Sequence, residues 1–560
     1  MSPFLLVTWV VVLSLCWLLP LASPPWPTFP ADAWSAVIAL LGALIVAMRV
    51  RAAVRWHAIT CWVAVLAVVP WLQFWLELLP YAGQAWISSA YLLGLLLTLL
   101  VGAQWERVSP LQLADGLFLA VGCASVASVG LQLYEWLAVS ESGGLGVLFT
   151  GFDRTRPAGN LGQPNQLATL LMWGLLAVLW GYLRKLLGAK LSAGAAAFLL
   201  VGLALTQSRT GLLSIGLMVV AVWTWRRLWP NKLMPWVVTG LALLFLALPV
   251  LLQSLNEALL LGQQDSYFRL GTQSDLRLKA WGLFFQAALD SPWWGYGWTE
   301  TTSAQMAGSD GFASIGSIFS HSHNLFLDLV LWLGLPLGLI TAVVLIRWFW
   351  LTVLAVKQPQ DLTLMLLLAS LGLHALLEFP LQYAYFLLPA GLVMGILNAR
   401  LGPEPLWSSP SGSLVGLCLA GALALGVTAR DYSRVYTSYT LLRLEQGLLG
   451  QGRPPLGGPP DVWVLTNLRE WIRVSRVKPK ADMSQSELSD METIAKHYPS
   501  LSAAYKLSVA LALNGRPDEA RAWLARICKF TDEKECRLAQ KTWESESPND
   551  LRTAAIKWPK

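Results

Sequence analysis

Charged residues are scarce in this chain of 560 residues. Aspartate, glutamate, lysine and arginine make up 13% of it, whereas apolar residues make up 55%, and the mean hydropathy is +0.54. Since soluble domains carry about 25% charged residues, this composition argues against a soluble protein and predicts a polytopic membrane protein. The net charge of +7 comes mostly from short basic loops. We therefore expect membrane lipids around the chain and no nucleic-acid partner.

Cysteine is sparse as well, and its spacing does not suit a metal site. Four of the six cysteines lie inside apolar runs, where we expect inert small hydrophobic residues: Cys16, Cys61, Cys123 and Cys418. Cys528 and Cys536 lie eight residues apart near the C-terminus, and the sequence leaves open whether they form a disulfide. No tight pair of carboxylates stands in the outer loops either. We expect no metal ion and no other cofactor.

Long apolar runs dominate what is present. Each is long enough to cross a bilayer, and they begin at Pro3, Trp34, Ala58, Ala85, Leu111, Leu167, Leu191, Gly211, Met234, Leu335, Leu362, Phe386 and Leu414. The sequence therefore predicts an all-α, polytopic membrane protein with about thirteen transmembrane helices. The first run lacks a basic segment before it, so we interpret it as a span and not as a signal peptide.

The basic residues of the short loops predict the orientation of these spans. If the spans simply alternate, the following residues all fall on one side: Arg49, Arg51, Arg55, Arg107, Arg184, Lys185, Lys190, Arg226, Arg227, Lys232, Lys357 and Arg400. Basic loops stay in the cytoplasm. The N-terminus is then cytoplasmic, and the C-terminal part lies outside after an odd number of crossings.

Hydrophobicity drops near Arg430, which divides the chain into two expected domains. Residues 1–430 form the transmembrane domain and residues 431–560 a soluble, outer α-helical domain. A linker rich in proline and glycine at 450–460 precedes the amphipathic helices of the second domain, which we expect at 462–477, 485–497, 501–514 and 518–529. The last two of these helices resemble one tetratricopeptide repeat, and an ordinary helical hairpin is an equal alternative.

Five arginines contradict the charge rule, because this topology places them at the outer membrane face: Arg154, Arg156, Arg209, Arg269 and Arg277. They lie in two long outer loops, 140–166 and 254–334, and at a short hairpin near Ser208. Charge at an unexpected membrane face indicates function. Guanidinium groups suit phosphate oxygens, so the cluster predicts binding of a lipid-linked polyanion such as a pyrophosphate.

Each of these positions also has a structural interpretation. Asn160, Gln163 and Asn165 stand where an apolar helix begins and could simply cap it around Pro164. Arg209 could reach toward lipid phosphates. Arg277 could lie on a solvated helix face. These readings do not account for the two arginines next to Asn160, so we favour a ligand-binding role for Arg156, Arg209 and Arg277 together.

The sequence HSHN, residues 321–324, contains the candidate for proton transfer. His323 could accept a proton from an incoming hydroxyl, with His321, Asn324 and Asp328 in support. A lone histidine is more often structural, and the pair in this motif favours the catalytic interpretation. His374 and Glu378 lie one helical turn apart in the eleventh span, where a structural pairing is as plausible as catalysis.

These segments resemble the bacterial O-linked oligosaccharyltransferases of the PglL type, which belong with the O-antigen ligases and Wzy-like polymerases. The resemblance covers residues 154–385. Its most specific element is GNLGQPNQLATLL from Gly159; further elements are SHSHNLFLDLVLWLGLPLGL, HALLEFPLQYAYFLLP, SRTG and RLKAWGLFFQAALDSPWWGYGW. It implies a GT-C-like ligase architecture whose active site is formed by the periplasmic loops 140–166 and 254–334.

The family resemblance implies the reaction. A preassembled glycan passes en bloc from undecaprenyl pyrophosphate to a serine or threonine of an exported protein such as a pilin, without a metal, at the periplasmic face of the bacterial inner membrane. His323 matches the essential histidine of the family, and Arg156, Arg209 and Arg277 match its donor-binding arginines. Direct displacement at the anomeric carbon would invert its configuration.

Three other functions remain open. An O-antigen ligase uses the same donor but glycosylates a lipid core, and a polymerase joins repeat units. The GNLGQPNQLA segment and the large outer domain argue against both, because that domain could present a docking surface to a protein acceptor. A polytopic lipid or glycan transporter would show related halves and broken helices near the midplane, whereas here the unusual residues gather at one face.

Overall fold

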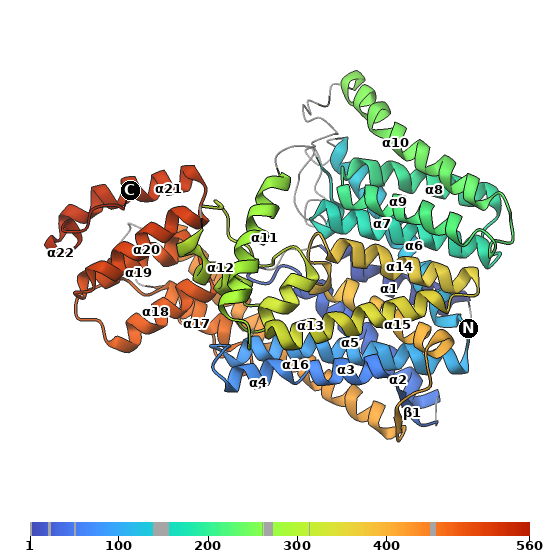
Figure 1. Ribbon diagram of the computed structural model, residues 1–560, viewed down its shortest axis with the longest axis horizontal. Coiled ribbons are helices and arrows are strands. Elements are labelled where there is room, and N and C mark those ends of the chain that lie inside the picture. Colours follow the sequence, from blue (N-terminus) through green and yellow to red (C-terminus); the bar gives the residue numbers. More distant parts are fainter. Residues whose placement is uncertain are drawn as a thin grey trace. The chain divides into compact units, whose positions relative to one another are not determined.

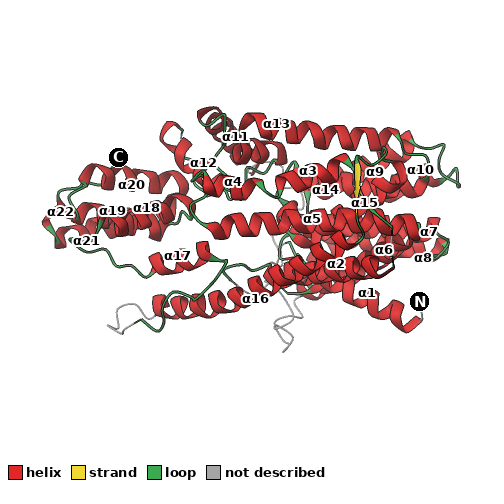
Figure 2. Cartoon of the chain, turned by 90° about the horizontal axis from the view of Figure 1, so that it is seen from below, coloured by secondary structure: helices red, strands yellow, loops and turns green. Residues whose placement is uncertain are grey.

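The structure, a computed structural model, describes residues 3–20, 24–49, 52–137, 156–259, 261, 273–312, 314–447 and 455–559. Helices make up most of this part of the chain (Figures 1 and 2). Arg154 and Arg269, together with parts of both outer loops, lie outside the described residues. The chain divides into two compact units, each with its own buried core.

The first unit comprises Met1–Val65, Ala90–Leu270 and Val344–Leu425. Its helices are α1 (Pro3–Leu18), α2 (Phe29–Arg49), α3 (Ala58–Leu66), most of α5 (Ala82–Val108), α6 (Gln112–Trp136), α7 (Pro164–Leu183), α8 (Ala189–Leu205), α9 (Arg209–Thr224), α10 (Met234–Ala258), α14 (Pro359–Ala375), α15 (Ala384–Leu401) and the start of α16 (Gly412–Gly447). Two short strands, β1 (Val54–Trp56) and β2 (Trp407–Ser409), pair antiparallel with Val54 opposite Ser409. Helix α7 lies beside α8 and α9 (Figure 1).

The second unit comprises Leu66–Ser89, Gly271–Val343 and Gly426–Lys560. It contains α4 (Val69–Trp75), α11 (Gln273–Asp290), α12 (Thr301–Gly308), the first part of α13 (Leu325–Leu354), α17 (Thr466–Ser475), α18 (Gln485–His497), α19 (Leu501–Leu513), α20 (Pro517–Phe530), α21 (Glu533–Glu546) and α22 (Leu551–Ala554). Helices α18, α19 and α20 lie side by side in both views.

The predicted class is confirmed: the chain is a mostly helical, multi-pass membrane protein. Every predicted apolar run overlaps a helix. Among the described residues, nine helical segments are long and apolar enough to cross a bilayer. Helices α1, α8, α9 and α14 are shorter, at 16 or 17 residues each. The number of thirteen spans therefore stays a prediction.

The C-terminal helices agree closely with the sequence pattern. Helix α19 ends just before Gly515, whose φ of +76° suits a chain reversal, and Pro517 begins α20. Helix α16 runs on to Gly447, past the hydrophobicity drop at Arg430. The structure joins Cys528 of α20 to Cys536 of α21 by a disulfide with Cα atoms 4.9 Å apart. The sequence left this pairing open.

Aromatic contacts hold the first unit together around α7. The ring of Trp173 meets Trp17 of α1 and Phe386 of α15 edge-on, with centroid distances of 6.5 and 5.3 Å.

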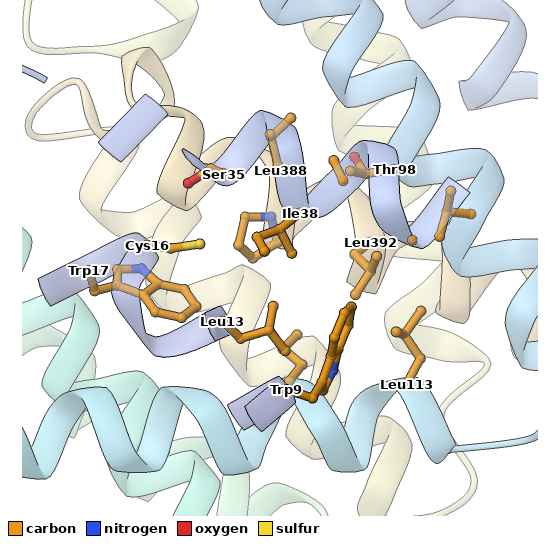
Figure 3. A pocket seen from close by; sticks show the side chains of 15 residues that line it. Trp9, Leu13, Cys16, Trp17, Ser35, Ile38, Thr98, Leu113, Leu388 and Leu392 are labelled. Atoms are coloured by element: carbon orange, nitrogen blue, oxygen red, sulfur yellow. The ribbon is translucent and has the colours of Figure 1, made fainter. Parts of the chain in front are cut away.

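An apolar cavity of about 60 Å³ lies near Trp17, lined by residues such as Leu13, Ile38 and Leu388 (Figure 3). Its lining contains no charged residue, so the predicted phosphate chemistry cannot take place there.

Candidate active site

The start of α7 carries the first group of predicted site residues. Gln163 is the N-cap: its side-chain oxygen accepts a hydrogen bond of 2.8 Å from the backbone N–H of Gln166, and Pro164 occupies the first helical position. Capping therefore accounts for Gln163 and Pro164. It does not account for Asn165, whose side chain points to other partners.

Asn165 links two segments that are distant in sequence. Its side-chain Nδ2 donates to Glu378 Oε1 at 3.1 Å, and its side-chain Oδ1 accepts from the hydroxyl of Ser208 at 2.7 Å. Gln163 adds a longer contact of 3.5 Å to Glu378 Oε2. Glu378 is buried and lies just past the end of α14, so it does not sit on the span where the sequence placed it. Its carboxylate organises this polar cluster.

Arg156 and Arg209 flank the same turn. The guanidinium of Arg156 donates through Nε to the carbonyl of Thr206 at 3.2 Å, and Arg209 is the first residue of α9. Ser208 caps this helix by accepting from the N–H of Gly211 at 3.1 Å. Arg209 is exposed and Arg156 half-buried. Two guanidinium groups thus lie near the N-terminus of α9, whose dipole adds partial positive charge, and the acid Glu378 belongs to the same cluster.

Two residues that the sequence analysis missed hold the segment next to Arg156. Glu135, buried at the end of α6, accepts from the N–H of Gly159 at 3.3 Å. Gln132 donates to the carbonyl of Pro157 at 2.9 Å. A buried acid near the end of an apolar span is costly and could have signalled this role. Asn160 is buried and donates to the carbonyl of Leu18 at 2.7 Å, so it anchors the turn to α1.

His374 has a structural place in the same unit. It is buried in α14, and its Nδ1 lies 2.8 Å from the hydroxyl of Thr169 in α7. This contact joins α14 to α7. It favours the structural alternative for His374.

The HSHN segment belongs to the second unit and is tied to the start of α13. Asp328, buried in the first turn of that helix, accepts from the N–H of Ser322 at 2.8 Å. Asn324 accepts through Oδ1 from the N–H of Phe326 at 3.1 Å and so caps the helix. His323 has a φ of +58°, a conformation uncommon for residues other than glycine. The tight turn presents this side chain.

The two histidines of the segment have different environments. His321 is buried, with its ring edge-on to Trp332 at a centroid distance of 6.0 Å. Burial, together with the nearby His323, lowers the pKa of His321 to about 3, so this imidazole is neutral at physiological pH. His323 is half-buried, and its ring lies 5.7 Å from that of Phe319. Of the two, His323 is the more exposed side chain.

Arg277 lies near the HSHN segment within the second unit. One turn further along α11, Trp281 donates through its indole N–H to the carbonyl of Ser322 at 2.8 Å. Residues four apart share a helix face, so the half-buried Arg277 stands on the side of α11 that holds this segment. Joint action of Arg277 with Arg156 and Arg209, which belong to the first unit, stays a prediction.

The second unit also contains a helix break within α13. Gly334 has φ +75° and ψ 168°, so α13 consists of two helical segments. A Cβ atom at Gly334 would overlap the carbonyl oxygen of Trp293. The N–H of Leu335 donates to the carbonyl of Pro292 at 2.7 Å, and that of Tyr296 to Leu331 at 2.7 Å. The segment DSPWWGYGW thus docks against the break.

Within the described part of the chain, no three histidine, cysteine, aspartate or glutamate side chains are grouped to hold a metal ion.

Three parts of the chain match known protein families. Residues 157–180 match the protein glycosylation ligase family, 194–343 the O-antigen ligase family, and 362–544 the C-terminal part of the virulence factor membrane-bound polymerases. The chain is 30% identical to the general O-oligosaccharyltransferase of Acinetobacter baylyi over 541 residues, which cover 93% of this chain and 92% of that protein. It is 27% identical to the ComP-specific O-oligosaccharyltransferase of the same organism over 296 residues, or 51% of this chain and 53% of that protein.

A multi-pass helical fold with these matches defines a membrane-bound glycosyltransferase. Because the first of these relatives is matched over nearly its whole length, the chain belongs to the O-oligosaccharyltransferases of the PglL type. The family resemblance drawn from its segments is confirmed.

Proposed function

We propose that this O-oligosaccharyltransferase takes a preassembled glycan from undecaprenyl pyrophosphate and transfers it en bloc to a serine or threonine of an exported protein such as a pilin. The names of both relatives support a protein acceptor as the general kind of partner. A polyprenyl pyrophosphate supplies the polyanion that an arginine-bearing turn at a membrane face would bind.

The proposed chemistry is direct displacement at the anomeric carbon. His323 takes the proton of the acceptor hydroxyl as the new glycosidic bond forms. The bond from the anomeric carbon to the pyrophosphate oxygen breaks on the opposite face, so the product is inverted. Arg156, Arg209 and Arg277 stabilise the charge that develops on the leaving pyrophosphate. No metal or other cofactor takes part in this scheme.

The neighbouring polar residues have supporting roles in this proposal. Asn160, Gln163, Asn165 and Glu378 fix the segment that carries Arg156 relative to the turn that carries Arg209. His321, Asn324 and Asp328 fix the turn that presents His323. The observation that carries the proposal is a difference in exposure: Arg209 is exposed and His323 half-buried, whereas four of the supporting residues are buried, namely Asn160, His321, Asp328 and Glu378.

We also propose the placement of the enzyme in the cell. The chain spans the bacterial inner membrane thirteen times in a GT-C-like arrangement, with its N-terminus in the cytoplasm. Residues 1–430 form the ligase domain, and the loops 140–166 and 254–334 form the active site on the periplasmic side. Residues 431–560 form a periplasmic domain, in which α19 and α20 make one tetratricopeptide-type unit. The disulfide between Cys528 and Cys536 supports an oxidising compartment for this domain.

A cell-based assay tests the proposed reaction. The chain is expressed together with a pathway for a lipid-linked glycan and a candidate pilin, and the intact mass of the pilin is measured. We expect a mass increase equal to one complete glycan with the native chain and no increase with His323→Ala. Unmodified pilin with the native chain in a strain with verified donor would contradict the proposal for that acceptor.

The O-antigen ligase reaction is the second candidate, and the match of residues 194–343 to that family favours keeping it. The same strain distinguishes the two, because it also contains the lipid core. Glycan attached to the lipid core and not to the pilin would indicate the ligase reaction. Glycans of multiple repeat lengths on the carrier lipid would indicate a polymerase.

A further inference from the structure

Helix α12 is attached firmly to the C-terminal helices through His497, the last residue of α18. Its Nδ1 lies 2.6 Å from Glu300 Oε2 and 3.0 Å from the hydroxyl of Ser303. The backbone carbonyl of His497 accepts from the hydroxyl of Thr302 at 3.2 Å. The Glu300 side chain is only 3% exposed. Gln84 and Ser303 also donate to the side chain of Glu300, so His497 is one of three side chains that hold this buried group at the N-terminus of α12.

The next residue along, Thr301, connects this helix end to the HSHN segment. Its fully buried hydroxyl donates to Asp328 Oδ1 at 3.3 Å and accepts from the indole N–H of Trp332 at 2.8 Å. The same oxygen of Asp328 accepts from the N–H of Ser322. Ser322 stands between His321 and His323. A displacement of Thr301 would therefore act on the backbone that presents His323.

One turn further along α12, Gln305 makes a second attachment to the same loop. Its side-chain amide donates to the carbonyl of Ser317 at 2.7 Å, and its side-chain oxygen accepts from the N–H of Phe319 at 2.8 Å. Phe319 is the residue whose ring lies against His323. Helix α12 thus holds the loop on both sides of His321.

We propose that α12 is a positioning bridge through which the C-terminal helices set the geometry of His323, and that His497 is a positioning residue of the transfer reaction. This inference rests on the proposed role of His323. Hydrogen bonds lead from His497 to Glu300, across one peptide bond to Thr301, and on through Asp328 to Ser322. Small displacements of a catalytic group reduce the rate of the chemical step far more than they reduce substrate binding.

The test uses the full-length enzyme with three variants at the α18 end of the bridge. His497→Ala removes one of the three side chains that contact the carboxyl group of Glu300, and His497→Asn keeps an N–H near the position of Nδ1. Lys496→Ala is the matched control, because this neighbouring side chain is half exposed and pairs with Glu492 within its own helix. For each variant, kcat and the KM for the lipid-linked donor are measured, together with hydrogen exchange in the peptide covering residues 314–324.

We expect His497→Ala to lower kcat by roughly tenfold to a hundredfold, with an unchanged donor KM and faster exchange in 314–324. His497→Asn should restore kcat and the exchange rate in 314–324 toward those of the native chain. Lys496→Ala should change neither kcat nor this exchange rate. An unchanged kcat, or a loss of kcat without faster exchange in this peptide, would overturn the bridge.

A second variant separates positioning from folding of the C-terminal helices. Thr301→Val keeps the shape of the side chain but loses both hydrogen bonds, and it leaves α18 untouched. It should reproduce the fall in kcat and the faster exchange in 314–324, while exchange in α18–α20 stays native. A fully active Thr301→Val would refute the bridge. An active His323→Ala would refute the proposed catalytic role itself, so the two failures are distinguishable.

Discussion

At the scale of single residues, Glu378 is a buried acid whose side-chain oxygens accept hydrogen bonds from two amide groups. Glu378→Ala leaves the side chains of Asn165 and Gln163 without this acceptor, and we expect a loss of about 1–3 kcal/mol of stability. The measurement is the thermal unfolding midpoint of the purified protein. Glu404→Ala, at an exposed position of the same unit, is the control and should leave the midpoint unchanged. Equal midpoints for both variants would contradict the role assigned to Glu378.

His321 makes the stability of the second unit sensitive to acid. Burial lowers its pKa in the folded state to about 3, and an unfolded histidine has a pKa of about 6.5. Between these values the unfolded chain binds more protons, so stability is complete above about pH 6.5 and falls as the pH drops toward 3. His321→Phe keeps the ring contact with Trp332 without titrating. Between pH 7 and pH 4, the thermal unfolding midpoint of this variant should fall less than that of the native chain. An equal fall would show that His321 does not cause the acid sensitivity.

The sequence could predict the residues whose chemistry stands out against their surroundings. Arg209 was a candidate because a cation is unusual at an outer membrane face, and His323 because an imidazole in the HSHN pair can transfer a proton near neutral pH; both roles stay predictions. Glu135 was missed although a buried acid in a span is an available signal, and Glu300 was missed because its partner His497 is 197 residues away. A long-range hydrogen bond leaves no periodic pattern in one sequence.

At the scale of elements, the break in α13 requires glycine. Gly334→Ala places a Cβ atom against the carbonyl of Trp293 in a backbone conformation with φ +75°, which we expect to cost about 1–3 kcal/mol. Gly372→Ala is the matched control, because that helical glycine has open space around it and alanine favours helix. The thermal unfolding midpoint should be lower for Gly334→Ala than for the native chain, and unchanged or higher for Gly372→Ala. The reverse order would contradict the structure of the break.

Elements built on apolar runs were predictable, and elements built on tertiary contacts were not. The runs located the helices that overlap them, whereas the break at Gly334 depends on contacts with Pro292 and Trp293. Helix α12 was not predicted, since TTSAQMAG has no apolar periodicity and its position depends on Glu300 and Thr301. Similarly, the local pattern predicted a capped start for α7 but could not show which of Gln163 and Asn165 is the cap. In the structure Gln163 caps the helix, and Asn165 contacts Ser208.

At the scale of the whole molecule, the disulfide tests the proposed location of the C-terminal helices. Alkylation and mass measurement of the protein purified without reductant should find Cys528 and Cys536 blocked, and reduction should release both. Cys536→Ser should lower stability by about 2 kcal/mol, from loss of a short closed loop. Cys123→Ser, at an exposed free cysteine, is the control. Free thiols at both positions in the cell-derived protein would contradict a periplasmic C-terminal domain.

The central claim is that arginines bind the pyrophosphate of the donor and His323 activates the acceptor. Its most direct test measures donor binding and glycan transfer side by side in purified variants. The account predicts that Arg209→Ala loses donor affinity and that His323→Ala binds donor normally but transfers no glycan. Arg227→Ala, beyond the other end of α9, should be native in both. Normal donor binding by Arg209→Ala, or transfer by His323→Ala, would contradict the claim.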